Sequence, residues 1–342
     1  MTSKERVEKL TAGEPIDRVP FEPAIYEHKA FLIGKTPSEV ARSGELLYQA
    51  LLKEHMLYGG DFLVAGLDVY NVEAEALGST VRFFDGNDVP AVSEPILEDL
   101  TGVKRLTVPD PETAGRMPLF LRTAEKLNRA LGDEVVIRGA VSGPFSLASE
   151  LFGMEKLLME TFTHPDSVAG LLEFSTQVIL AYADAFLDRG AGVVVFDSRC
   201  APPLISPGLY ETTVLPFHKT IMTHLKNRNQ SVRALIIGGD TIPIDPFLAK
   251  TGANILLADF TVDPEKAFDA VSDNGIILRA NLDPFQLRYG DAPEIEETSR
   301  HLIERGLSHR RFIMGTGVVP FDTPPERVKI VRDAVLNYGR WP

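Results

Sequence analysis

Short apolar runs that end in a polar residue or a glycine recur eight times along the chain, at residues 19–24, 62–68, 135–142, 193–197, 234–239, 255–259, 276–281 and 312–317. Longer amphipathic stretches with turn signals separate these runs. This alternation is the sequence pattern of βα units. Eight parallel strands are the number that closes a TIM barrel. We therefore predict an α/β fold, a (β/α)8 TIM barrel.

The stretches between the runs refine this prediction. Residues 165–189 repeat apolar side chains at three-to-four spacing, and Gly190 follows as a stop signal, which predicts a helix. The stretch between the second and third runs is too long for one helix. Its portion STVRFFDGNDVPAVSEPI, residues 79–96, predicts extended strands around a DGND turn. We interpret it as an insertion between strands 2 and 3. Because no low-complexity linker interrupts the sequence, we predict one catalytic domain spanning residues 1–342.

The composition excludes several classes of function. Lys and Arg number 35 against 48 Asp and Glu, a formal charge of −13 that repels nucleic acid and anionic lipid surfaces. The first residues, MTSKERVEKL, are charged where a signal peptide would be apolar, and no run reaches the roughly 18 apolar residues of a membrane span. We therefore expect a cytoplasmic protein with no nucleic-acid or membrane partner. One cysteine, Cys200, rules out an internal disulfide and a multi-thiolate metal site within one chain.

Polar residues cluster where the predicted strands end, which in a TIM barrel is the position of the active site. Several carboxylates that converge on one barrel mouth raise the pKa of at least one of them, and this suits general acid catalysis. The alternative for each carboxylate taken alone is that it caps the following helix. The residues at these strand ends are Glu22, Asp68, Ser142, Asp197, Asp240, Asp259, Asn281 and Thr316.

Several motifs resemble the uroporphyrinogen decarboxylase superfamily, which also contains corrinoid-dependent methyltransferases. They are DRVP (residues 17–20), YGGD (58–61), VEAEALG (72–78), GPF (143–145), LISP (204–207) with Tyr210 and Pro216, NLDP (281–284) and DTP (322–324). The resemblance covers nearly the whole chain. It implies a (β/α)8 barrel, in agreement with the eight runs.

The departures from the family pattern indicate the branch. Family decarboxylases hold a tetrapyrrole with eight carboxylates by an arginine-bearing segment after the first strand, and the matching PAIYEHKAF, residues 23–31, contains no arginine. A histidine on the eighth strand of those decarboxylases would fall near Thr316, and this sequence has no histidine there. The thiol-methylating members bind zinc through a His-x-Cys pair and a distant cysteine, and the matching positions hold Ile236, Gly238 and Val318. The resemblance therefore implies neither zinc nor thiol activation here, and we predict no metal ligands.

The methyltransferase role that remains is transfer from a small donor, such as a methoxylated aromatic (O-demethylation), to the cobalt of a corrinoid carried by a partner protein. The leaving group must then be protonated, or coordinated by a metal, as the C–O bond breaks. The alternatives are a decarboxylase with a less anionic substrate and a non-catalytic tetrapyrrole or corrinoid binder. The resemblance also allows a homodimer. For the partner's macrocycle we expect an open rim near strands one and two, with Phe31, Leu32, Phe83 and Phe84 as its apolar surface or as ordinary packing residues.

We predict catalytic roles at the ends of the first two strands and after the fourth, for Glu22, Tyr26, His28, Asp68, Tyr70, Asn71 and Asp197, with Glu27 as a further candidate acid. We predict substrate or cofactor contacts for Glu73, Cys200, Asp240, Asp259, Arg279, Asn281 and Thr316. His28 as a solvated loop residue and Cys200 as a small buried side chain are the alternatives. Arg138 and Arg279 lie within strand runs, so each needs a carboxylate partner, from the protein or, for Arg279, from the substrate.

Overall fold

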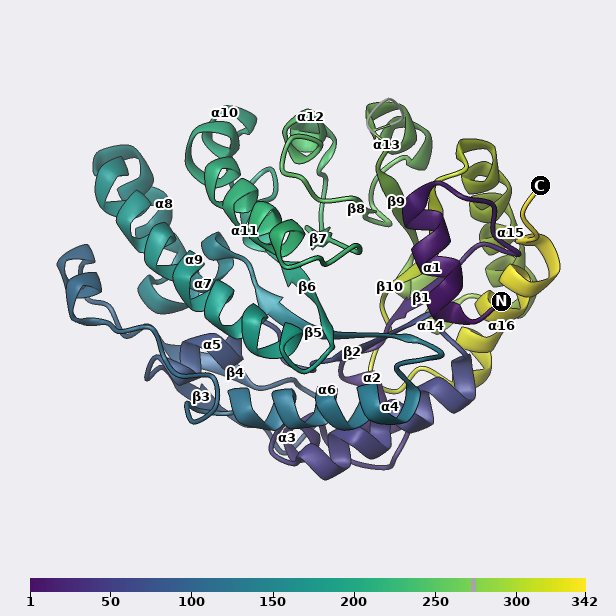
Figure 1. Cartoon of the computed structure of the whole chain (residues 1–342), viewed down its shortest axis with the longest axis horizontal. Helices are drawn as coiled ribbons and strands as arrows, with labels where there is room; N and C mark the ends of the chain where they lie inside the picture. The colour runs from purple at the N-terminus through teal and green to yellow at the C-terminus, as the bar shows by residue number, and fades with distance from the viewer. Residues whose placement is uncertain (272–274) are drawn as a thin grey trace.

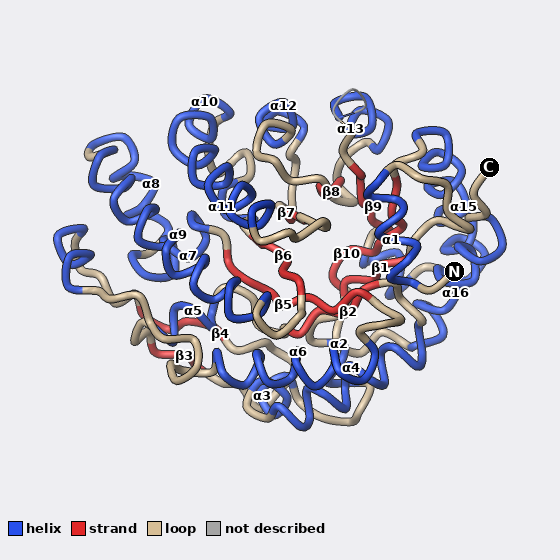
Figure 2. Tube along the Cα trace, in the orientation of Figure 1, coloured by secondary structure: helices blue, strands red, loops and turns tan. Residues whose placement is uncertain are grey.

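The computed structural model describes residues 1–271 and 275–342 and confirms the predicted barrel. Eight parallel strands pair in the order β1-β10-β9-β8-β7-β6-β5-β2 (Figure 2). Each of the eight apolar runs supplies one strand. The strands are β1 (Phe21–Ala24), β2 (Phe62–Ala65), β5 (Val136–Ser142), β6 (Gly192–Phe196), β7 (Ala234–Ile236), β8 (Ile255–Ala258), β9 (Ile277–Leu282) and β10 (Phe312–Val318).

The barrel closes between β1 and β2, the two ends of this strand order. The two strands form no ladder in the described residues, but the backbone N–H of Asp61 donates to Phe21 O at 2.8 Å. The buried Asp61 carboxylate accepts hydrogen bonds from Phe21 N at 2.6 Å, Arg6 at 2.5 Å and Arg18 at 2.8 Å. One aspartate thus joins both edge strands to the N-terminal helix.

Helices surround the barrel, and the two chain ends lie near each other (Figure 1). The predicted helix at 165–189 is α9, and Gly190 follows it with φ +75°. The α-helices are α1 (Ser3–Ala12), α2 (His28–Phe31), α3 (Pro37–Ala41), α4 (Gly44–Tyr58), α5 (Asn71–Ala76), α6 (Met117–Leu131), α7 (Pro144–Phe152), α8 (Met154–Thr163), α9 (Pro165–Leu187), α10 (Pro207–Leu209), α11 (Leu215–Asn227), α12 (Asp245–Leu248), α13 (Pro264–Val271), α14 (Pro284–Tyr289), α15 (Ala292–His309) and α16 (Pro325–Tyr338). The 3-10 helices are η1 (Leu100–Arg105), η2 (Ser198–Cys200) and η4 (Ile242–Ile244), and η3 (Tyr210–Val214) is a π-helix.

The predicted insertion between strands 2 and 3 is an antiparallel hairpin of β3 (Thr80–Arg82) and β4 (Ala91–Glu94). The side chain of Asn71, at the start of α5, donates to Pro90 O and accepts from Val92 N at 3.2 Å. These bonds attach the hairpin to the segment that follows β2. The insertion therefore lies beside the C-terminal end of the barrel.

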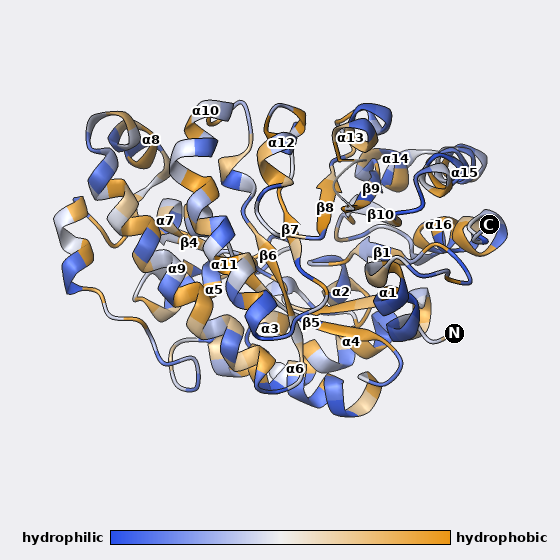
Figure 3. Ribbon diagram, turned by 45° about the horizontal axis from the view of Figure 1, so that its top comes forward, coloured by the Kyte–Doolittle hydropathy of each residue, from blue (hydrophilic) through white to orange (hydrophobic). Residues whose placement is uncertain are grey.

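The apolar core has two parts. One lies between the strands and the helices, and strands such as β5 and β8 are accordingly hydrophobic over most of their length (Figure 3). The other fills the barrel interior, where Phe62, Val194 and Ile255 pack with Val7 and Leu10 of α1. Helix α1 therefore covers the N-terminal end of the barrel. No helix in the described ranges is both long and apolar enough to cross a membrane.

Candidate active site at the barrel mouth

A cavity of about 290 Å³ lies at the C-terminal ends of the strands. Its lining comes from the C-terminal ends of β1, β6, β7, β8, β9 and β10, from the segments that follow β1, β2, β6, β7 and β8, and from Val89 of the hairpin. Apolar side chains such as Leu67, Phe196 and Leu257 form much of its wall. This volume is near the lower end of the range of small-molecule sites, about 300–1,000 Å³. The mouth therefore suits a ligand of about one aromatic ring.

Three buried charged side chains, Glu22, Arg138 and Arg279, form a group in the barrel interior, and of these three Arg279 alone lines the cavity. Glu22 of β1 is in close contact with Arg138 of β5, and the same carboxylate oxygen is 3.5 Å from Arg279 Nη1 of β9. Arg279 also donates to Thr316 O at 3.2 Å. Glu22 Oε2, Arg138 Nε and Nη1, and Arg279 Nε have no hydrogen-bond partner among the described residues. Arg279, the member of this group that lines the cavity, thus offers a donor that the described protein does not satisfy.

Gly315 of β10 leaves room for two of these polar side chains. A Cβ atom at this position would lie 2.2 Å from Asn281 Oδ1 and 2.5 Å from Arg279 Nε. Asn281 Oδ1 is buried without a partner in the described structure, and both side chains line the cavity. The glycine is therefore required for the positions of Arg279 and Asn281.

Two tyrosines stand at the side of the mouth. Tyr26, after β1, packs edge-on against Phe196 with 5.9 Å between ring centroids. Burial raises the pKa of Tyr26, so its phenol stays protonated and can donate a hydrogen bond. The hydroxyl of Tyr70 accepts from Ser198 N at 3.3 Å, and the backbone of Tyr70 has φ +81°. Tyr26 is therefore a candidate hydrogen-bond donor in this cavity, and Tyr70 links the loops after β2 and β6.

Three carboxylates line the mouth, those of Glu27, Asp68 and Asp259. Burial raises the pKa of Glu27, although Lys29 lowers it, and a raised pKa favours the neutral acid. Asp259, after β8, accepts hydrogen bonds from Thr261 N at 3.1 Å and from its hydroxyl at 2.9 Å. Glu27 is thus the candidate proton donor of this cavity, and Asp259 has a local structural partner.

Asp68 lines the cavity, but its carboxylate is bound by the protein. Arg116, at the start of α6, holds the two oxygens at 3.0 and 2.7 Å and is also in contact with Glu75. Arg116 is not predictable as a partner of Asp68 from the sequence. It lies 48 positions from Asp68, and no local pattern connects the two.

Several predicted site residues have structural partners away from the mouth. His28 is buried between Tyr58 OH at 2.7 Å and Phe321 O at 2.8 Å. The carboxylate of Glu73 accepts from the backbone and hydroxyl of Ser142, and burial raises its pKa. The structure does not bring these side chains into the cavity. The others in this group are Asn71, which holds the hairpin, Thr316, whose hydroxyl accepts from Ala24 N at 3.0 Å, and Asp240, which is exposed and accepts from Ile242 N.

Asp197 and Cys200 belong to a closed network outside the cavity lining. Asp197 accepts from Ser146 N at 2.6 Å and contacts His218 Nε2 at 2.8 Å, and His218 Nδ1 lies 2.8 Å from Tyr210 OH. The Cys200 thiol donates to Asp197 O, and burial raises its pKa well above the usual value. Asp197, Cys200 and His218 lie close enough together to hold a metal ion, but each of their side chains already has a hydrogen-bond partner. Sequence reasoning missed His218, which is 21 positions from Asp197.

The sequence matches the family of uroporphyrinogen decarboxylase (URO-D) over residues 2–338. The chain belongs to this family. It is 28% identical to the methylcobamide:CoM methyltransferase MtbA of Methanosarcina mazei, over 98% of both chains. It is 27% identical to the uroporphyrinogen decarboxylase of Salinibacter ruber, over 98% of this chain and 96% of that one.

A solved structure supports the same fold. A methyltransferase from Methanosarcina mazei superposes with a TM-score of 0.88 and 24% identity over 99% of both chains. The URO-D family thus includes relatives of two activities among those most similar to this chain. The choice between methyl transfer and decarboxylation has to come from the side chains of the mouth.

The positions that the resemblance assigns to zinc meet in this mouth. The cavity is lined by Ile236 of β7, by Gly238 just after β7, and by Val318 of β10. None of the three side chains can coordinate a metal. The arginine-free segment at 23–31 also borders the cavity, through Ala24, Tyr26 and Glu27. The mouth of this family member therefore differs from both expected patterns at these cavity-lining positions.

Proposed function

We propose that this URO-D family protein transfers a methyl group from an aryl methyl ether to the cobalt of a corrinoid that a separate protein carries. The observation that carries the proposal is the composition of the mouth, in which proton donors surround a small apolar cavity and Ile236, Gly238 and Val318 replace thiol-activating ligands. The methyltransferase relatives support a corrinoid as the methyl acceptor.

The chemistry at the donor is a displacement at the methyl carbon. Reduced cobalt(I) supplies the electron pair of the new Co–C bond, and the electron pair of the broken C–O bond stays on the phenolic oxygen. A proton from Glu27 makes the leaving group a neutral phenol, while the hydroxyl of Tyr26 donates a hydrogen bond to the same oxygen. The apolar wall excludes water, and this strengthens both interactions.

The lining disfavours the decarboxylase alternative. Arg279 is the one guanidinium among the described cavity residues, and the acidic Glu27 and Asp259 share the wall with it. A tetrapyrrole with eight carboxylates would need several cations at these positions. The decarboxylase relatives keep this reaction as an outcome that the test below separates.

The rim suits a partner that inserts a flat macrocycle. Phe260 and Val318 of the cavity wall are 39% and 46% exposed, and Phe285 and Tyr289 on the adjacent α14 are 69% and 63% exposed. An exposed apolar group beside a cavity is typical of a protein or cofactor contact. We place the corrinoid partner here rather than at strands one and two. Phe31, Leu32, Phe83 and Phe84 are partly buried, and Phe31 and Phe83 pack against Phe321 and Arg42.

The test is to mix the protein with cob(I)alamin and a panel of methoxylated aromatics and to follow methylcobalamin by absorbance. We expect methylcobalamin with the wild-type protein and a rate at least about 100-fold lower for Glu27→Gln, the size of a lost general acid. Tyr26→Phe should lower the rate about tenfold, the value of one buried hydrogen bond. Tyr48→Phe on α4, outside the cavity, is the matched control and should keep the wild-type rate.

Carbon dioxide release from a porphyrinogen by the folded protein, without methylcobalamin from any ether, would favour decarboxylation. A wild-type rate for Glu27→Gln would remove Glu27 from the proposal. The expected pH dependence follows from the raised pKa of Glu27, because the rate falls once the pH passes that pKa and the proton is lost.

A further inference from the structure

The buried group of Glu22, Arg138 and Arg279 has an excess of positive charge, and Arg279 presents it to the mouth. Arg138 and Arg279 are 1% and 3% exposed, and Glu22 is the one described carboxylate that forms an ion pair with either of them. A buried charge without a partner is costly, so two guanidinium groups that share one carboxylate favour a further anion. Arg279 Nε and Asn281 Oδ1 beside it have no hydrogen-bond partner in the described structure.

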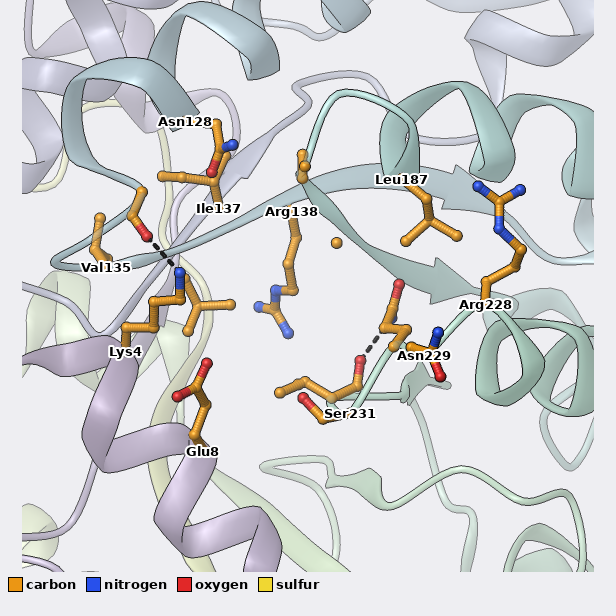
Figure 4. A pocket seen from close by; sticks show the side chains of 17 residues that line it. Lys4, Glu8, Asn128, Val135, Ile137, Arg138, Leu187, Arg228, Asn229 and Ser231 are labelled. Carbon is orange, nitrogen blue, oxygen red and sulfur yellow. Dashed lines mark hydrogen bonds between the residues drawn. The ribbon is translucent and has the colours of Figure 1, made fainter.

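The two arginines differ in their surroundings. Arg138 takes the closer contact with Glu22, and its side chain also borders a second pocket of about 230 Å³ at the N-terminal end of the barrel. Figure 4 shows Arg138 and Glu8 of α1 directed into that pocket from different sides. Arg279 is farther from Glu22, at 3.5 Å, and lines the mouth. Arg279 is therefore the cation whose charge a ligand in the mouth can balance.

We propose that the donor carries one carboxylate group and that this group pairs with Arg279. The inference rests on the proposed function and narrows its donor to a methoxylated aromatic monocarboxylate. The apolar walls at Leu67 and Phe196 accept the ring, and the carboxylate of Asp259 repels any second carboxylate on the donor. A single negative charge thus matches the one unbalanced cation.

This binding mode also orients the methyl group. Arg279 lies within β9, whereas Glu27 follows β1 and Val318 is the half-exposed last residue of β10. Arg279 pairs in register with Ile313, so it lies deeper along the strands than Glu27 and Val318. In the proposed binding mode, with the carboxylate at Arg279, a methoxy group on the opposite side of the ring is directed toward the strand ends that carry these two residues. The methyl group then points toward the partner's cobalt, and the ether oxygen lies beside its proton donor.

Calorimetric titration without any corrinoid tests this inference independently of catalysis. The ligands are 4-methoxybenzoate, the neutral 4-methoxybenzamide of the same shape, and methoxyacetate, which has the carboxylate and ether without the ring. We expect the wild-type protein to bind the benzoate at least about tenfold more tightly than the amide, as a charge-assisted buried bond would give. Methoxyacetate should bind more weakly than the benzoate.

Variants assign the preference to a residue. Arg279→Gln should bring the affinities for the benzoate and the amide within about twofold of each other. Arg288→Gln is the control: it removes a cation of α14 that is paired with Asp322, and it should leave the ratio of the two affinities unchanged. Glu22→Gln should tighten the benzoate, because it removes the competing carboxylate, whereas a merely disturbed fold weakens all ligands.

Equal binding of benzoate and amide by the wild-type protein, or an unchanged ratio in Arg279→Gln, would overturn the inference. Methoxyacetate that binds as tightly as the benzoate would overturn the aromatic assignment. Methylcobalamin formation from neutral ethers together with equal binding would leave the methyl transfer standing and remove only the carboxylate. Tight benzoate binding without methylcobalamin formation would support the carboxylate at Arg279 and count against the methyl transfer.

Discussion

The seam between β1 and β2 offers a prediction whose size follows from the structure. Asp61 is fully buried, and its carboxylate accepts from Arg6, Arg18 and Phe21 N. Asp61→Ala removes all these bonds at once. Breaking a buried ion pair costs about 3–5 kcal/mol, because an unpaired charge remains. Arg6 keeps its second partner, Asp17 at 2.6 Å, so we expect a loss near the lower end of this range.

The assay is urea unfolding followed by circular dichroism. A loss of about 3 kcal/mol is a large part of a typical stability of about 5–15 kcal/mol and should lower the urea midpoint by roughly 1 M. Glu297→Ala is the control, because it breaks an exposed pair with Arg300 and should not shift the midpoint measurably. An Asp61→Ala midpoint equal to that of Glu297→Ala would refute the argument that this carboxylate closes the barrel.

Three further predictions concern single positions. Gly315→Ala should weaken donor binding and lower the free energy of unfolding by about 1–3 kcal/mol, because the added Cβ overlaps Asn281 and Arg279. The control is Gly170→Ala in α9, which has no atom near the added Cβ and should be neutral or stabilising. Calorimetry measures donor binding and urea unfolding measures stability for both variants. Burial raises the pKa of Glu54 to about 7, so between about pH 4.5 and 7 the native state binds a proton that the unfolded state has lost. Over this range the free energy of unfolding of the wild type should fall relative to that of Glu54→Gln, by up to about 1.4 kcal/mol per pH unit, in urea unfolding measured at each pH. The same pH dependence of stability in both proteins would contradict this. Cys200 should resist iodoacetamide in the folded protein and react after unfolding, since burial raises the pKa of its thiol, and mass spectrometry that finds rapid native alkylation would contradict this.

Strand positions could be predicted from the sequence, because continuous apolar runs between turn signals leave few alternatives to buried parallel strands. The predicted ends were less accurate. The run at 62–68 extends beyond β2, which stops at Ala65, since Gly66 already leaves the ladder and its carbonyl accepts from Lys29. The run at 234–239 likewise outlasts β7, which ends at Ile236.

Which strand-end side chains reach the mouth depends on the alternation of faces along a strand. Arg279 and Asn281 are two positions apart and both point into the barrel, and Asn281 pairs in register with Gly315, the neighbour of Glu22. A shift of one position reverses the face. Thr316 and Asp197 each come one residue after an inward position, so their side chains lie between strands and helices. Thr316 and Asp197 were therefore predicted as site residues on their position at a strand end, without regard to the face on which they lie.

Partners distant in sequence were beyond reach in principle. A guanidinium within an apolar strand needs an anion, and the sequence alone predicts this need at Arg138 and Arg279. The identity of the anion depends on which strands face each other across the barrel, and Glu22 lies 116 positions from Arg138 and 257 from Arg279. Once the structure pairs these residues, one carboxylate stands against two guanidinium groups. The negative charge proposed for the ligand therefore rests on the count of these buried ions rather than on any motif.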